Sequence, residues 1–146
     1  MKTGVIVLLF SIFLLTGCSS AMLAYKTKGE PYQQLQERKR QEQTIFYNNQ
    51  KYYCYSCDGT PSRTYTNAIG NNVVVYLYRV QLDFNTHCSV GYGSASCESG
   101  YSRCDMVEER FELKNNAVID ATVVNGFGRR LQVYSDACQG YTEIEN

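Results

Sequence analysis

The sequence predicts an α+β domain that is mainly β: a small antiparallel sheet with an N-terminal tether or helix, stapled by disulfides. From Thr44 onward the chain is rich in Tyr, Val, Phe and Asn, which favour strands and turns over helices. A short apolar run near the N-terminus is typical of an export signal. The chain also holds seven cysteines, and small exported domains commonly use disulfides to supplement a modest core.

Residues 1–17 have the order of a lipoprotein signal peptide. Lys2 supplies a positive start, and the apolar run from Val5 to Leu15 is shorter than the about 20 residues that a transmembrane helix needs. Residues 15–18, LTGC, resemble the lipobox of bacterial lipoproteins, in which the cysteine sulfur receives a diacylglyceryl group before cleavage. The resemblance implies that Cys18 is lipidated and becomes the first mature residue. The alternative is an ordinary signal peptide that contains a cysteine.

The same resemblance implies a cellular location. Two or three acyl chains hold a protein on a membrane far more firmly than one. In lipoproteins of this kind an aspartate after the cysteine retains the protein in the inner membrane, and here Ser19 follows. We therefore expect a lipid-anchored protein of the bacterial outer membrane that faces the periplasm.

Residues 18–44 are expected to form a polar, lipidated tether with a possible helix over residues 31–43. Pro31 suits a first helical position, and good helix formers follow it. The basic cluster of residues 38–40 is flanked by glutamates and is interpreted as a solvated helix face. Without residues 1–17 the chain has 13 Lys and Arg against 14 Asp and Glu, a net charge of −1. Nucleic acid is thus not an expected partner.

A single disulfide-stabilised antiparallel β domain is expected over residues 45–146. Two short strands surround residues 48–50, because asparagine tolerates the left-handed backbone of a hairpin turn. The clearest strand follows in residues 71–84, where one face collects the even-numbered apolar positions. These are Val74, Tyr76, Tyr78, Val80, Leu82 and Phe84.

The second half of the domain is expected to hold a loop over residues 85–104 and then a hairpin. Asn115 and Asn116 supply its turn. Its first strand collects Val107, Phe111 and Leu113 on one face, and its second collects Ala117, Ile119, Ala121 and Val123. A short final strand is expected to place Leu131 and Val133 inward.

Residues 58–124 resemble the small SmpA/OmlA-type outer-membrane lipoproteins and other short lipoproteins with a helix-and-sheet domain. The turn at residues 59–62, the segments RTYT and VVVYLY, and residues 111–118 carry the resemblance. This chain differs from those lipoproteins in having YYCYSC before the turn and Asn115-Asn116 where glycine is usual. The resemblance implies a scaffolding role in β-barrel assembly or envelope maintenance.

The other six cysteines are expected to form three disulfides in the oxidising periplasm. Loop closure favours the pairs Cys54–Cys57, Cys88–Cys97 and Cys104–Cys138, although six cysteines can pair in many ways. The alternative for Cys54 and Cys57 is a redox-active Cys-x-x-Cys centre, and a zinc site is a further one. A turn with Asp58 follows, whereas an activated thiol favours a helix N-terminus.

Few other residues indicate catalysis, so we expect no enzyme, no metal and no cofactor. His87 is the only histidine, which argues against a His-rich metal site. Glu108 and Glu112 are interpreted as a solvated strand face, and with Glu109 they do not amount to an acid–base pair.

Tyrosine remains conspicuous, with 13 copies in the chain. Because tyrosine gives rigid, amphipathic contact area, Tyr92 and Tyr101 near the cysteine-rich loop are the candidates for a partner surface; half-buried strand positions are the alternative. The expected function is a non-enzymatic, membrane-anchored protein-binding or scaffolding module whose partner is another envelope protein. A thiol–disulfide enzyme and a binding inhibitor or exclusion factor are the alternatives.

Overall fold

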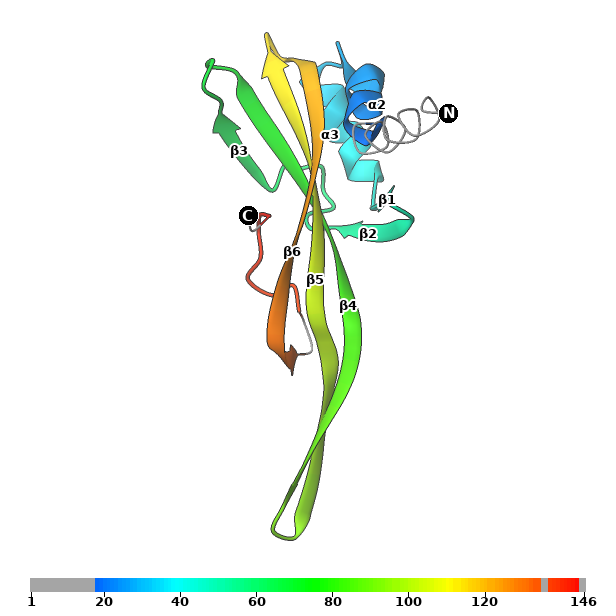
Figure 1. Cartoon of the computed structure of the whole chain (residues 1–146). Helices are drawn as coiled ribbons and strands as arrows, with labels where there is room; N and C mark the ends of the chain where they lie inside the picture. The colour runs from blue at the N-terminus through cyan, green and yellow to red at the C-terminus, as the bar shows by residue number, and fades with distance from the viewer. Residues whose placement is uncertain (1–17, 135–136, 145–146) are drawn as a thin grey trace, which may run out of the picture.

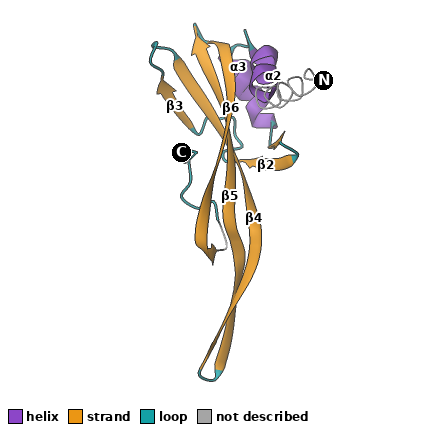
Figure 2. Cartoon of the chain, in the orientation of Figure 1, coloured by secondary structure: helices purple, strands orange, loops and turns teal. Residues whose placement is uncertain are grey.

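The computed structural model describes residues 18–134 and 137–144, and confirms a mainly β, antiparallel fold (Figures 1 and 2). The described residues hold two helices, where one was expected. The expected signal peptide lies outside the described residues. The sheet has the strand order β1-β2-β4-β5-β6, and β3 also pairs with β4. The elements are α2 (Cys18–Thr27), α3 (Tyr32–Gln41), β1 (Thr44–Tyr47), β2 (Gln50–Cys54), β3 (Arg63–Thr66), β4 (Asn72–Gly91), β5 (Ser94–Lys114) and β6 (Ala117–Tyr134).

Asparagine pairs close two of the hairpins, as the sequence predicted. Asn48 and Asn49 join β1 to β2 with φ of 48° and 63°, and Asn115 and Asn116 join β5 to β6 with φ of 51° and 63°. Both residues of each pair therefore adopt the left-handed conformation that matches the twist of the flanking strands.

The predicted loop at residues 85–104 is wrong, because these residues continue β4 and β5. The two strands pair without a break in register from Asn72↔Leu113 to Gly91↔Ser94, apart from an interruption at Asp83. At about 3.3 Å per residue, the 20 residues of β4 span roughly 65 Å. The far half of this hairpin extends alone from the rest of the molecule, as Figure 1 shows.

The helices cover one face of the sheet. Leu35 of α3 is fully buried against side chains of β4 and β5, including Tyr76, Tyr78 and Phe111. Leu23 and Ala24 of α2 pack at the margin of the same cluster. The backbone between the helices is also fixed, since the amide of Gly29 donates to the carbonyl of Val118 at 2.7 Å.

This packing corrects the interpretation of residues 18–44 as a tether. The predicted helix is present as α3, but both helices belong to the folded unit, which therefore begins well before residue 45. The polar composition was misleading because α3 contributes one large apolar side chain, Leu35, and one buried cation, Lys39. No helix in the described part of the chain is long and apolar enough to cross a membrane.

The C-terminal segment covers the opposite face. Ala137, Cys138 and Ile144 are buried there against Leu77, Cys104 and Met106. The guanidinium of Arg79 donates to the carbonyls of Cys138 and Tyr141, at 2.8 and 3.3 Å. The upper half of the sheet is thus covered on both faces, which explains why every residue from Val73 to Tyr78 is buried.

The predicted even-numbered face of β4 is correct as far as Val80, which packs at the margin of the same cluster, and fails at Phe84. Val74, Tyr76 and Tyr78 lie in the core beneath the helices, whereas the Phe84 side chain is 61% exposed. Asp83 adopts a φ of 57°, and the ladder skips its partner Ser102. Beyond this point Phe84 contacts Tyr101, which packs against the cluster on the other face.

The predicted inward face of β6 is wrong at the start of the strand, because the strand has a bulge there. Val118 pairs with Leu113, but Asp120 pairs with Glu112, so Ile119 is an extra residue in the ladder. An extra residue reverses the alternation of side chains, and Val118 is therefore buried instead of Ala117 and Ile119. Ala121 and Val123 keep their predicted face. The predicted final strand is the end of β6, and the side chains of Leu131 and Val133 lie outside those described.

The cysteines of all three expected pairs lie at disulfide distance. The Cα atoms of Cys54 and Cys57, Cys88 and Cys97, and Cys104 and Cys138 lie 5.6, 4.1 and 5.1 Å apart. The first bridge closes a surface turn, the second crosses the long hairpin, and the third ties the C-terminal segment to β5.

Candidate functional site

The free half of the β4–β5 hairpin is the candidate functional site, and we call residues 84–101 the arm. Its turn consists of Tyr92 and Gly93, and Gly93 supplies the positive φ of 81° that the turn requires. Hydrogen bonds between hydroxyl side chains link the two strands. The Oγ1 of Thr86, for example, lies 2.8 Å from the Oγ of Ser99. This Gly- and Ser-rich segment, which was predicted to be a loop, is therefore a narrow two-stranded ribbon.

The arm presents apolar side chains to solvent. Val90 and Tyr92 are almost completely exposed at the turn, and Phe84 is largely exposed at the base. Phe84 and Tyr101 meet edge to face, with ring centroids 5.2 Å apart. The structure thus places the two predicted tyrosines at opposite ends of the arm: Tyr92 at its turn and Tyr101 at its base, half-buried.

The disulfide Cys88–Cys97 stabilises this ribbon. A two-stranded hairpin is marginally stable in water on its own, and among the described residues the outer part of the arm packs against no third element. A bridge midway along the arm removes most of the freedom that the open ribbon would gain. The arm is therefore a preformed element.

We expect the double variant Cys88→Ser, Cys97→Ser to loosen the arm while the body keeps its unfolding midpoint. A bridge spanning nine residues destabilises the open chain enough to lower its population roughly 100-fold in the chain-entropy description. Amide hydrogen exchange at the inward-facing positions His87, Ser89, Ser96 and Glu98 should quicken by about this factor, with residues 73–78 unchanged. Equal protection of the arm in both proteins would contradict the role of the bridge.

An open groove lies where the arm leaves the body. β2 pairs with β4 only at Tyr53↔Arg79 and Cys54↔Tyr78 and then diverges. The groove is lined by Gln50, Lys51, Tyr53, Cys54, Arg79, Val80, Gln81, Leu82, Tyr101 and Cys138. The base of the arm is consequently continuous with this groove.

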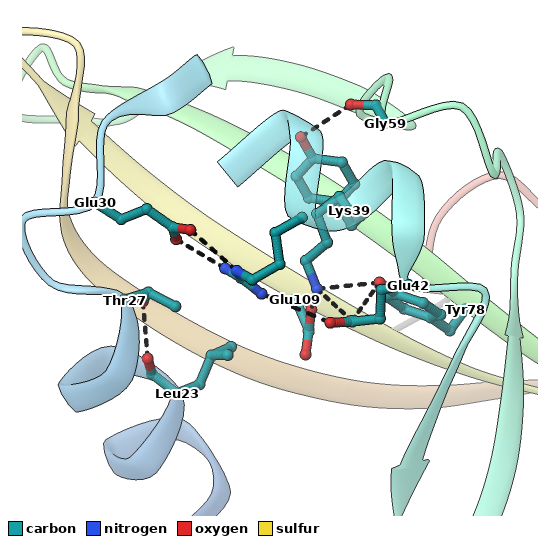
Figure 3. Close-up of polar contacts among 10 residues, drawn as sticks. Leu23, Thr27, Glu30, Lys39, Glu42, Gly59, Tyr78 and Glu109 are labelled. Carbon is teal, nitrogen blue, oxygen red and sulfur yellow. Dashed lines mark hydrogen bonds and ion pairs between the residues drawn. The ribbon is translucent and has the colours of Figure 1, made fainter. Parts of the chain in front are cut away.

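A buried charged cluster fixes α3 above the sheet. The ammonium of Lys39 donates to Glu42 at 2.7 Å, to the hydroxyl of Tyr78 at 3.1 Å and to the carboxylate of Glu109 (Figure 3). The Lys39 side chain is only 1% exposed. It also lies over the ring of Phe111, 5.4 Å from the centroid, where a cation is attracted to the π face.

Burial also sets the protonation of this cluster. Desolvation raises the pKa of the Glu109 carboxyl, and the ammonium of Lys39 opposes the rise. Desolvation likewise raises the pKa of Tyr78, so its hydroxyl stays protonated and donates to Glu42 at 2.9 Å. The interpretation of residues 38–40 as a solvated face is therefore wrong for Lys39.

A second buried carboxylate holds the other face. Glu108 is fully buried, and its Oε2 accepts from Arg63 at 2.9 Å and from Arg110 at 2.7 Å. Its Oε1 accepts from the amide of Ile144 at 3.1 Å. The predicted solvated face at Glu108 is wrong, because cations from β3 and β5 and the C-terminal backbone supply its partners. Both carboxylates are thus buried in the core together with the cations that neutralise them.

Cys54 is the last residue of β2 and Cys57 lies in the turn that follows, so the pair is not at a helix N-terminus. Asp58 follows it, and the amide of Thr60 and the hydroxyl of Ser56 both donate to its carboxylate at 2.8 Å. These bonds lower the pKa of Asp58 and keep it charged beside Cys57. A neighbouring carboxylate disfavours a thiolate, so this setting lacks the activation typical of redox Cys-x-x-Cys centres.

Comparisons of the chain with models of known protein families, with curated proteins and with solved structures find no match.

Proposed function

We propose that this chain is a non-enzymatic, lipid-anchored binding module of the bacterial outer membrane, and that the arm contacts a partner protein of the envelope. The observation that carries the proposal is the arm itself: a ribbon extending alone from the body, cross-linked at Cys88–Cys97, with Val90 and Tyr92 exposed at its turn. Exposed large apolar side chains on a preformed element favour association, because little conformational freedom is lost on binding.

The position of Cys18 supports this arrangement. Cys18 is the first residue of α2, and α2 lies beside the helix-covered half of the sheet, far from the turn of the arm in Figure 1. A lipid attached at Cys18 would hold the body at the membrane and leave the arm directed elsewhere. The intact mass of the membrane-extracted protein, with an N-terminal peptide that begins at a lipidated Cys18, tests the anchor; an unmodified Cys18 would contradict it.

Photo-crosslinking tests the arm. A benzoylphenylalanine at Tyr92 should capture a discrete envelope protein in intact cells, whereas the same residue at Ile69, which is 78% exposed in the β3–β4 connection at the other end of β4, should not. Tyr92→Ala should weaken the association roughly 30-fold, the typical cost of losing an aromatic hot spot. Equal capture from both positions, or unchanged binding of Tyr92→Ala, would contradict the proposal.

A further inference from the structure

The arm has strand edges that no neighbour occupies within the described residues. β2 leaves β4 after Arg79, so the edge of β4 from Val80 to Gly91 is unpaired on that side. β6 pairs with β5 only as far as Tyr101, which leaves the edge of residues 94–100 unpaired as well. Such edges present rows of backbone donors and acceptors that another strand can complete.

The ladder shows which backbone groups point outward. The 4.1 Å between the Cα atoms of Cys88 and Cys97 corresponds to a pair that exchanges no hydrogen bonds, for which about 4.5 Å is typical. The two-residue turn agrees, since it makes Gly91↔Ser94 a bonded pair and the rungs alternate from there. Thr86, Cys88 and Val90 thus direct N–H and C=O away from β5, along the free edge of β4.

Nothing in the sequence of the arm protects this edge. Natural sheets block open edges with lysine, proline or inward-pointing charges, yet residues 84–101 contain no Lys, Arg or Pro, and Glu98 is their only acidic residue. An edge that is held in a ribbon by a disulfide and lacks such residues is suited to pairing with another strand.

We propose that the β4 edge of the arm, centred on residues 86–90, binds an extended segment of a partner protein by strand addition. This rests on the proposed function and specifies how the arm binds. The β4 edge is favoured over the β5 edge because it is longer and runs into the groove at the base of the arm. The bound segment would continue the line of β2 along β4.

The groove indicates the chemistry of that segment. Lys51 lines it, and among the described residues its ammonium has no carboxylate partner and lies over the ring of Tyr53, 5.5 Å from the centroid. The arm beyond is almost uncharged. The segment therefore carries uncharged strand-forming residues along the arm and an acidic residue at the end that enters the groove.

Proline substitutions separate the two edges. Thr86 and Ser99 face each other on one rung, and Val90 and Ala95 on another. Proline at any of the four removes an outward N–H and spares the bonds between β4 and β5. Thr86→Pro and Val90→Pro thus block the β4 edge, while Ser99→Pro and Ala95→Pro are matched controls on the β5 edge.

The probes are random dodecapeptides displayed on phage and selected on the full-length protein in detergent. Selected peptides should bind at least about tenfold more weakly to Thr86→Pro and Val90→Pro, and within about twofold of the original affinity to the two control variants. Peptide binding should also slow amide exchange at Thr86, Cys88 and Val90, and not at Ala95 or Ser99. This second readout needs no variant.

Several results would overturn the proposal. Peptides affected equally by all four substitutions, or by none, would show that binding does not use the β4 edge. Slow exchange that grows with protein concentration, without peptide, would assign the edge to a second copy of the chain. If crosslinking from Tyr92 still captures its partner in these cases, strand addition alone fails and the binding role of the arm stands.

Discussion

Lys39→Met is expected to destabilise the folded protein by about 3–5 kcal/mol, because removing one partner of a buried ion pair leaves the other charge buried without a partner. The substitution keeps most of the length of the side chain and removes the ammonium that contacts Glu42, Tyr78 and Glu109. Urea unfolding at neutral pH measures the change. Lys39→Met combined with Glu109→Leu should recover most of the loss, because both charges are then absent.

The pH dependence of this variant has a definite sign. Burial already raises the pKa of Glu109, and without Lys39 the pKa rises further. A carboxyl with a higher pKa in the folded state holds its proton more tightly there, so stability is greatest below the unfolded pKa and falls as pH rises through the folded pKa. The deficit of Lys39→Met should therefore be larger at about pH 8 than at about pH 5. A deficit independent of pH would contradict the charge-burial explanation.

The double variant Cys104→Ala, Cys138→Ala should cost the body about 4 kcal/mol. The bridge spans 34 residues, and the chain-entropy description gives roughly this value for a loop of that length. Both cysteines are also buried, so packing is lost with the bond. The unfolding midpoint in urea measures the effect, and exchange of the Ile144 amide should quicken as its bond to Glu108 opens.

Cys88→Ala with Cys97→Ala is the matched control for this measurement. It also removes a bridge, but one that closes a shorter loop within the exposed arm. Its effect on the midpoint of the body should be small. If both double variants shift the midpoint equally, the C-terminal segment does not depend on its bridge in the way proposed.

Local signals in the sequence were sufficient for the turns and the disulfides. Asn48-Asn49 and Asn115-Asn116 form their turns because the asparagine preference for positive φ acts within the residue itself. The three cysteine pairs follow from loop closure, which depends mainly on separation along the chain. Both kinds of prediction need no knowledge of distant partners.

The burial of charged residues could not be predicted in this way. Glu109 and Lys39 stand 70 positions apart, and Glu108 depends on Arg63 from another strand. Each isolated pattern indicates a solvated face, because only the assembled sheet supplies the opposite charge. The arm was missed for a related reason: Thr86, Ser89, Ser96 and Ser99 gain strand character from pairing with one another.

The adjacent carboxylates of β5 also restrict how this sequence can change. Glu109 is matched to α3 on one face, and Glu108 to β3 and the C-terminal segment on the other. A homologue that loses the cation at position 39 should have lost the acid at position 109 too, and positions 63 and 108 should be linked in the same manner. Covariation across an alignment should thus reveal the two faces of the sheet, each through its own pair of charges.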